Sequence, residues 1–154
     1  MKIVKGVAAG LAAASMLISV PASADAGMSS AEKLRRLDIM LMVTGLRCRN
    51  TADNFNADYG RFTTNHLTEL NGASRTLKAD MGKRYGAAGA NRALDRFSTQ
   101  MANDYGQGHP WLNCAQLKQV TRSLADMRGT APLLEAADEL LSDSGPRQLA
   151  WVRK

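Results

Sequence analysis

The fold is decided by residues 29–48, which read SSAEKLRRLDIMLMVTGLRC. Ser29 and Glu32 form a capping-box pattern, because the serine hydroxyl accepts from the backbone N–H near Glu32 while the glutamate reaches back. Apolar residues then recur at steps of three and four, and the run from Ile39 to Val43 is apolar on nearly every side. We therefore expect a helix that is central to the fold and ends near Arg49.

The helical period continues through most of the chain, with a cap or a helix breaker at each expected boundary. Thr51 or Asp53 caps the next segment, Asn71–Gly72 stops it, and Pro110 interrupts the chain later. No alternating β-branched run predicts a strand. The expected further helices cover residues 51–70, 74–85, 90–105, 117–127 and 130–141. The sequence predicts an all-α fold, a single small domain of five or six short helices at 29–143, followed by a basic tail at 144–154 that docks or stays unstructured.

Residues 1–26 have the layout of a secretory signal peptide. Lys2 and Lys5 form a positive start, residues 7–20 are apolar, and the small residues before Ala24 offer a cleavage site. Cleavage is expected after Ala24 or after Ala26. The location predicted for the mature protein is periplasmic or secreted, and no transmembrane segment is expected after signal cleavage.

The charge of the mature chain is mild. Removal of residues 1–24 leaves 130 residues with 18 basic and 14 acidic side chains, a net charge of +4. The basic residues are spread along the sequence and form no focused stripe, so no nucleic-acid partner is expected. The partner is left open: an envelope protein or a component of the cell wall.

Cys48 and Cys114 are the only cysteines, so one intramolecular disulfide is possible. Export favours this pairing, because disulfides persist in oxidising compartments. The alternative is a redox-active or metal-binding thiol, but the Cys-x-x-Cys spacing typical of such sites is missing. We expect a disulfide that joins the first long helix to the helix beginning near residue 114.

The segment at residues 54–66 has the most unusual composition, because it mixes aromatic residues with amides and hydroxyls that are poor helix formers. Local preference is violated most often at functional or strained places. A polar face with helical spacing, a candidate for binding a ligand or partner, consists of Asn54, Asp58, Arg61 and Asn65. The alternative is an ordinary amphipathic helix whose aromatic residues enter the core.

A second candidate binding site is the loop at residues 106–111, which contains His109 and Trp111. Flexible glycines beside a titratable ring and a large aromatic side chain are typical of binding loops. A tight turn between two helices needs the same residues for structural reasons, so this alternative stays open.

No motif in the sequence is typical of a particular enzymatic reaction. The chain has no nucleophile elbow, no phosphate-binding loop and no dinucleotide fingerprint. Its two histidines lack metal-ligand spacing, so we predict no catalytic residue, no metal and no cofactor. A hydrolase would have to use His109 or Glu69 as its acid or base.

Four short segments have a combined pattern seen elsewhere: LDIMLM at 37–42, LRCR at 46–49, LNGA at 70–73 and HPWLNC at 109–114. Together they resemble a family of small exported bacterial helical proteins without assigned function. Members are sometimes labelled S-adenosylhomocysteine hydrolase. This chain does not support that label, because it is far too short and lacks the glycine-rich cofactor-binding unit.

The leading hypothesis is an exported, non-enzymatic helical binding or envelope-interaction protein of unknown ligand. The first alternative is a small envelope hydrolase that acts on a glycan or peptide. The second alternative is a periplasmic stress chaperone that exposes apolar surface at low pH. The sequence predicts these classes from compartment, size and missing catalytic motifs, and identifies no ligand.

Overall fold

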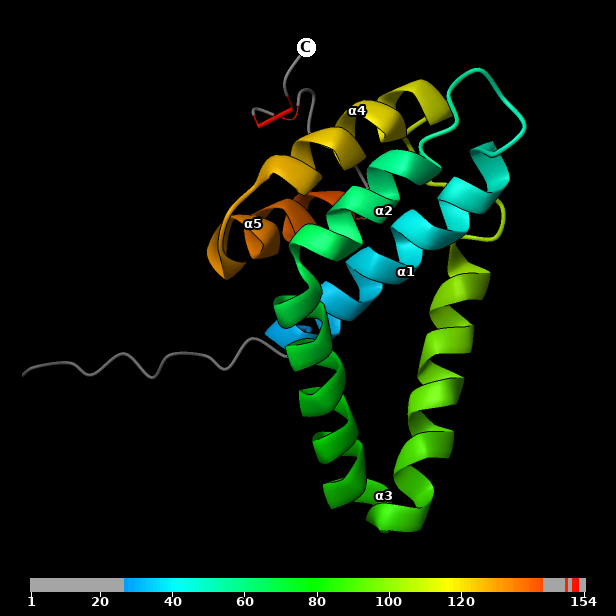
Figure 1. Ribbon diagram of the computed structural model, residues 1–154. Helices are drawn as coiled ribbons and strands as arrows, with labels where there is room; N and C mark the ends of the chain where they lie inside the picture. The colour runs from blue at the N-terminus through cyan, green and yellow to red at the C-terminus, as the bar shows by residue number, and fades with distance from the viewer. Residues whose placement is uncertain (1–26, 143–148, 150, 153–154) are drawn as a thin grey trace, which may run out of the picture.

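The computed structural model describes residues 27–142, 149, 151 and 152, and the predicted signal peptide lies outside them. Within this part the chain forms α-helices and no strand, which confirms the all-α prediction. The helices, labelled in Figure 1, are α1 (Ser30–Cys48), α2 (Asn56–Asn65), α3 (Leu67–Asp104), α4 (Cys114–Asp126) and α5 (Thr130–Leu140).

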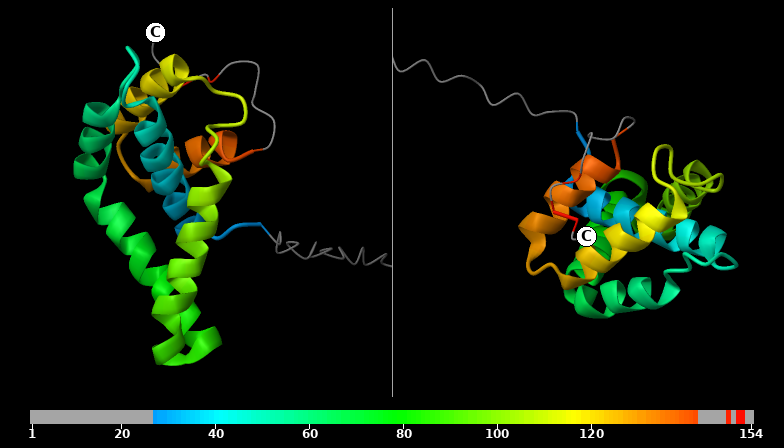
Figure 2. Two further views of the ribbon diagram at one scale, coloured as in Figure 1. Left: turned by 90° about the vertical axis from the view of Figure 1, so that its right-hand side faces the viewer. Right: turned by 90° about the horizontal axis from the view of Figure 1, so that it is seen from above.

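Helix α1 lies at the centre, as its apolar run predicts. It contacts each of the other four helices, and both views in Figure 2 show it running through the middle of the molecule. Leu37, Met40 and Leu41 on this helix are fully buried. Burial of a side chain of this size stabilises the fold by about 1.5–3 kcal/mol. Ser29 caps the helix as predicted, because its hydroxyl oxygen accepts the Glu32 N–H at 3.2 Å. The Glu32 carboxylate, expected to complete the capping box, instead accepts from Arg36 Nε at 3.4 Å.

Helix α3 consists of two arms that meet at Gly86. This glycine has φ 73° and ψ 163°, a conformation that interrupts the helix and favours glycine. Gly86 lies in the gap between the helices predicted at 74–85 and 90–105, so the break expected there is confirmed. Figure 1 shows the two arms converging on a tip that projects away from the other helices. We call residues 75–96, the outer part of both arms with the tip, the α3 hairpin.

The boundary between α2 and α3 differs from the prediction. Asn71–Gly72 lies inside α3, and the break falls at His66, with φ −115° and ψ 23°. Tertiary hydrogen bonds fix this break: His66 Nε2 donates to the Leu124 carbonyl at 2.8 Å, and Asn65 Nδ2 donates to the Ala125 carbonyl at 2.8 Å. These bonds to α4 cannot be read from local sequence.

The start of α2 was also predicted wrongly. The Thr51 hydroxyl donates to the Cys48 carbonyl at 2.8 Å and accepts the Asp53 N–H at 3.2 Å, so it forms a turn after α1. Asn54 Oδ1 accepts the Asn56 N–H at 3.0 Å, just where α2 begins. Short polar side chains can either form a turn after one helix or cap the start of the next. In this loop Thr51 forms the turn, and Asn54 binds the backbone where α2 begins.

The Cys48–Cys114 disulfide joins the last residue of α1 to the first residue of α4, with a Cα–Cα distance of 5.7 Å. The predicted pairing is confirmed. Helix α4 starts with a full capping box: Asn113 Oδ1 accepts the Gln116 N–H, and Gln116 Oε1 accepts the Asn113 N–H. The spacing Asn-x-x-Gln is the sequence signal for this cap, and sequence analysis missed it.

Three residues of the predicted tail are described, and all three pack against the hydrophobic core: Leu149, Trp151 and Val152. Trp151 Nε1 also donates to a carboxylate oxygen of Glu139 at 2.8 Å. This part of the tail therefore docks beside α5.

Candidate functional site

The predicted polar face of α2 lies against α4. The Asp58 carboxylate accepts two hydrogen bonds from the Arg122 guanidinium, from Nε at 3.3 Å and from Nη2 at 3.4 Å. Arg61 lies 3.5 Å from the same carboxylate and 3.9 Å from Asp126. Asp58 and Arg61 thus take part in ion pairs between α2 and α4.

The two asparagines of this predicted face have backbone partners. Asn54 Nδ2 donates to the Arg49 carbonyl at 2.8 Å and holds the loop between α1 and α2. Asn65 binds the end of α4, as described above. Asp58, Arg61 and Asn65 lie on α2 and Asn54 precedes it, and all four make intramolecular contacts.

The His109–Trp111 loop is held by the C-terminal end of α5. His109 Nε2 donates to the Leu140 carbonyl at 2.9 Å, and Nδ1 accepts the backbone N–H groups of Trp111 at 3.4 Å and Leu112 at 3.2 Å. Trp111 Nε1 donates to the Ser142 carbonyl at 3.1 Å. His109 is 8% exposed, and burial lowers its pKa. Its ring thus links three backbone segments and has both nitrogens occupied.

The structure does not bring the two predicted sets of residues to shared partners. The α2 set contacts α4 and the end of α1, whereas His109 and Trp111 contact the end of α5. Glu69 lies in the first turn of α3 and is partly exposed.

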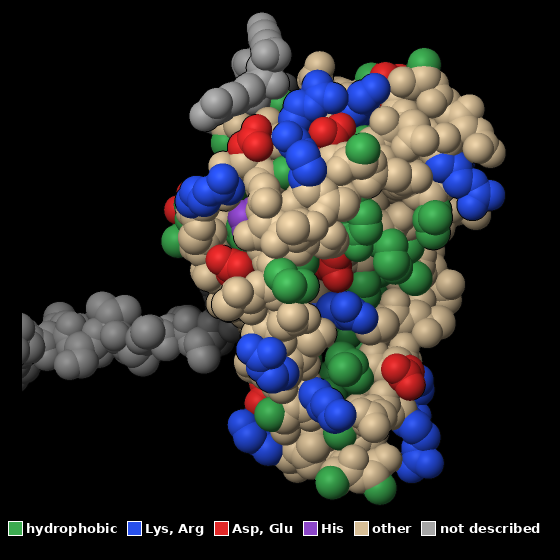
Figure 3. All heavy atoms as spheres, viewed as in Figure 1, with side chains coloured by type: hydrophobic (Ala, Val, Ile, Leu, Met, Phe, Trp, Pro, Cys, Tyr) green, Lys and Arg blue, Asp and Glu red, His purple; other side chains and the backbone are tan. Residues whose placement is uncertain are grey.

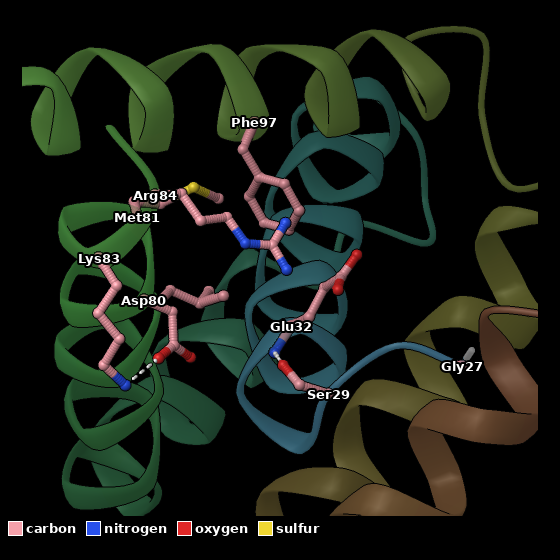
Figure 4. A pocket seen from close by; sticks show the side chains of 9 residues that line it. Gly27, Ser29, Glu32, Asp80, Met81, Lys83, Arg84 and Phe97 are labelled. Carbon is pink, nitrogen blue, oxygen red and sulfur yellow. Dashed lines mark hydrogen bonds and ion pairs between the residues drawn. The ribbon is translucent and has the colours of Figure 1, made fainter. Parts of the chain in front are cut away.

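A pocket of about 410 Å³ lies between the start of α1 and the two arms of α3. Figure 4 shows that its walls come from all three segments. Its apolar side chains are Leu77 and Met81 from the first arm and Phe97 from the second. Its polar lining residues are Ser29, Glu32, Asp80, Lys83 and Arg84. The volume falls in the range of small-molecule sites, and sequence analysis did not group these residues.

Both acidic residues that line this pocket have ion-pair partners, whereas one of its basic residues, Arg84, has none among the described residues. Glu32 accepts from Arg36 Nε at 3.4 Å, and Asp80 accepts from Lys83 Nζ at 2.9 Å. Arg84 makes no ion pair within the described part of the chain, and Figure 4 shows its side chain extending across the pocket toward Phe97 and Glu32. The pocket therefore offers a cationic group beside an apolar wall.

A partly buried polar network ties the pocket region to α2. Asp38 on α1 accepts the Tyr59 hydroxyl at 2.9 Å and pairs with Arg35 Nη1 at 3.4 Å. Arg35 Nη2 also donates to Ser98 Oγ on the second arm of α3 at 3.3 Å. Burial raises the pKa of Asp38, while the Tyr59 hydrogen bond and the Arg35 charge lower it less. Burial and then the Asp38 charge raise the pKa of Tyr59. This network fixes α1 relative to its neighbours.

The described residues offer neither a metal site nor a membrane-spanning helix. No group of three or more His, Cys, Asp or Glu side chains there could hold a metal ion. Of the helices α1 to α5, none combines the length and hydropathy that a membrane crossing requires.

The chain was also compared with known proteins. No protein-family model, no curated protein and no solved structure matches it.

Proposed function

We propose that this protein is an exported, non-enzymatic binding protein of the cell envelope, whose pocket between α1 and α3 holds a small amphipathic ligand with an anionic group. The observation that carries this proposal is the pocket itself. Leu77, Met81 and Phe97 supply an apolar wall for the hydrophobic part of the ligand. Arg84 supplies a cation for the anionic part.

Export is supported by the signal-peptide pattern of residues 1–26 and is compatible with the Cys48–Cys114 disulfide. The intact mass of protein recovered from the envelope checks this point. Loss of residues 1–24 or 1–26 is expected, together with the two hydrogens lost on disulfide formation. A full-length mass with both thiols free would contradict export.

The hydrogen bonds of His109, the histidine that a hydrolase would use as its acid or base, also support a binding function. His109 uses Nε2 to bind the Leu140 carbonyl and Nδ1 to bind two backbone N–H groups. A general acid or base needs a ring nitrogen within reach of its substrate. The observed contacts give this histidine a structural role.

The proposal is tested by titrating the protein with 1-anilinonaphthalene-8-sulfonate, a fluorescent probe that joins an aromatic system to an anionic sulfonate. We expect saturable binding at one site, with the blue-shifted emission of an apolar environment. Replacement of Arg84 by Gln should weaken binding about tenfold or more, because a hydrogen bond to a charged group contributes about 1.5–3 kcal/mol.

Lys78→Gln is the matched control, because it removes an equal charge from an exposed position on the same arm of α3 that does not line the pocket. Its affinity for the probe should equal that of the unmodified protein. Competition by laurate then tests whether an aliphatic anion enters the same site. Absence of probe binding, or equal weakening by both substitutions, would contradict the proposed site.

A further inference from the structure

The positive charge of the described chain is concentrated on the α3 hairpin. Residues 75–96 hold six lysines and arginines against two aspartates, a net charge of +4. The remaining described residues hold nine lysines and arginines against ten acidic residues, a net charge of −1. These six cations lie in one continuous stretch of the sequence, and the fold places that stretch at one end of the molecule. The molecule therefore has a basic end and a nearly neutral body.

Most of the basic side chains on the hairpin are accessible and carry uncompensated charge. Arg75, Lys78, Arg92 and Arg96 are exposed. Within the part of the chain that the structure describes, only Lys83 of the hairpin cations makes an ion pair, with Asp80. At physiological salt, charges act over about 8 Å, so this group presents a local positive field.

The tip of the hairpin is uncharged, and basic residues follow it along both arms. Residues 85–91 carry no charge and are mostly glycine and alanine, and Tyr85 among them is 55% exposed. Arg84 and Arg92 stand at the two ends of this uncharged stretch, and further cations follow along both arms. In Figure 3, hydrophobic side chains reach the lower end of the molecule, and Lys and Arg side chains lie above them.

We infer that the tip of the α3 hairpin docks onto the surface of an anionic lipid bilayer. An exposed tyrosine among small uncharged residues fits the interfacial layer, where aromatic side chains are enriched. The cations behind it then lie at the level of the lipid phosphates, and lysines or arginines near an anionic surface attract it. An uncharged tip followed by cations matches the layers of a bilayer, in which an interfacial region lies next to the phosphates. An acidic protein would need only the cations and not the exposed tyrosine at the tip. The inference goes beyond the proposed pocket and does not depend on it.

The test is sedimentation of the exported protein with vesicles of phosphatidylglycerol and phosphatidylcholine, compared with vesicles of phosphatidylcholine alone. We expect binding to the anionic vesicles only, and weaker binding as salt is raised. The triple substitution Lys78→Gln, Arg92→Gln and Arg96→Gln should weaken binding at least about tenfold, since each cation near such a surface contributes about 1 kcal/mol. None of these three residues lines the pocket.

The matched control is Arg49→Gln, Lys118→Gln and Arg128→Gln, which removes an equal charge from positions outside the hairpin. Its binding should stay within about twofold of the unmodified protein, and far-ultraviolet circular dichroism checks that both variants are folded. Tyr85→Ser should also weaken binding while leaving the charge unchanged.

Three outcomes would overturn the inference. One is equal weakening by the two triple variants, which would make the effect one of total charge. Another is equal binding to neutral vesicles. The third is binding to soluble poly-glutamate without binding to anionic vesicles, which would identify an acidic protein as the partner. Because the substitutions avoid the pocket, the sulfonate titration distinguishes failure of this inference from failure of the proposed function.

Discussion

Single polar side chains in this protein donate hydrogen bonds to the free backbone carbonyls at helix ends. The last four carbonyls of a helix lack partners within it, and neither α4 nor α5 has a basic residue in its last turn. Asn65 and His66 donate to carbonyls at the end of α4, while His109 donates to the last residue of α5. Residues that look like ligand-binding groups in the sequence are therefore used as partners for helix ends.

His109 makes the stability of the protein depend on pH. Burial lowers its pKa, so near that pKa the folded protein binds fewer protons than the unfolded chain. Its contribution to stability is present above about pH 6.5 and is lost as the pH falls through the lowered pKa. Protonation also places a proton on Nδ1, which then faces the N–H groups of Trp111 and Leu112.

The measurement is urea unfolding of the protein and of His109→Gln at a series of pH values from 7.5 to about 5. At pH 7.5 the variant should be less stable by about 1–3 kcal/mol, because buried donors and acceptors lose their partner. The two free energies of unfolding should converge as the pH is lowered. Other titrating groups are shared by both proteins and cancel in the difference. A gap that stays constant over this range would contradict the role of the imidazole.

At the scale of elements, the two glycines of α3 at positions 72 and 86 have different roles. Both would offer open space to a Cβ atom, because no heavy atom lies within 4 Å of either position. They differ in backbone conformation: Gly72 lies within a regular helical arm, whereas Gly86 has φ 73° at the turn between the arms. The sequence signal Asn71–Gly72 resembles a helix stop, but nothing in the fold uses it as one.

Replacing each of these glycines by alanine should change stability in opposite directions. Gly72→Ala should raise the free energy of unfolding by about 0.5–1 kcal/mol, because glycine is the poorer residue in a helix interior. Gly86→Ala should lower it by about 1–3 kcal/mol, because an alanine is strained at this conformation. Thermal or urea unfolding of the pair measures both effects. If both variants were destabilised equally, Gly72 would not lie in a regular helix.

At the scale of the whole molecule, the disulfide and α1 organise the arrangement of helices. The Cys48–Cys114 bond closes a loop of 66 positions that contains α2 and both arms of α3. The arms of α3 therefore start and end on a body whose two halves are covalently joined.

Removal of the disulfide should destabilise the fold strongly. For a loop of this length the chain-entropy model gives about 4 kcal/mol. The double substitution Cys48→Ala and Cys114→Ala should therefore lower the free energy of unfolding by about this amount in urea titrations. Unmodified protein kept reduced should show a similar loss, which separates the cross-link from the side-chain change. A loss below about 1 kcal/mol in both cases would contradict this role of the bond.

The candidate site could be predicted from sequence only in its local parts. Three of the four residues of the predicted polar face lie on α2, but Asp58 pairs with Arg122, which is 64 positions away in the sequence. The pocket combines Ser29 with Phe97, and its walls come from the start of α1 and two separate arms. No periodicity links such distant positions. The group of cations at 75–96 can be read from the sequence, but its position at one end of the molecule depends on how the two arms of α3 meet at Gly86.

The helical class, the capped and buried central helix, the break near Gly86 and the cysteine pairing all follow from the amino-acid sequence. These features depend on local periodicity, on backbone conformation and on the presence of only two cysteines. The break at His66, the partners of the polar side chains and the pocket depend on tertiary structure, as does the position of the basic stretch 75–96 at one end of the molecule. The physical reason is that hydrogen bonds to helix ends and the walls of the pocket form between residues that are distant along the chain.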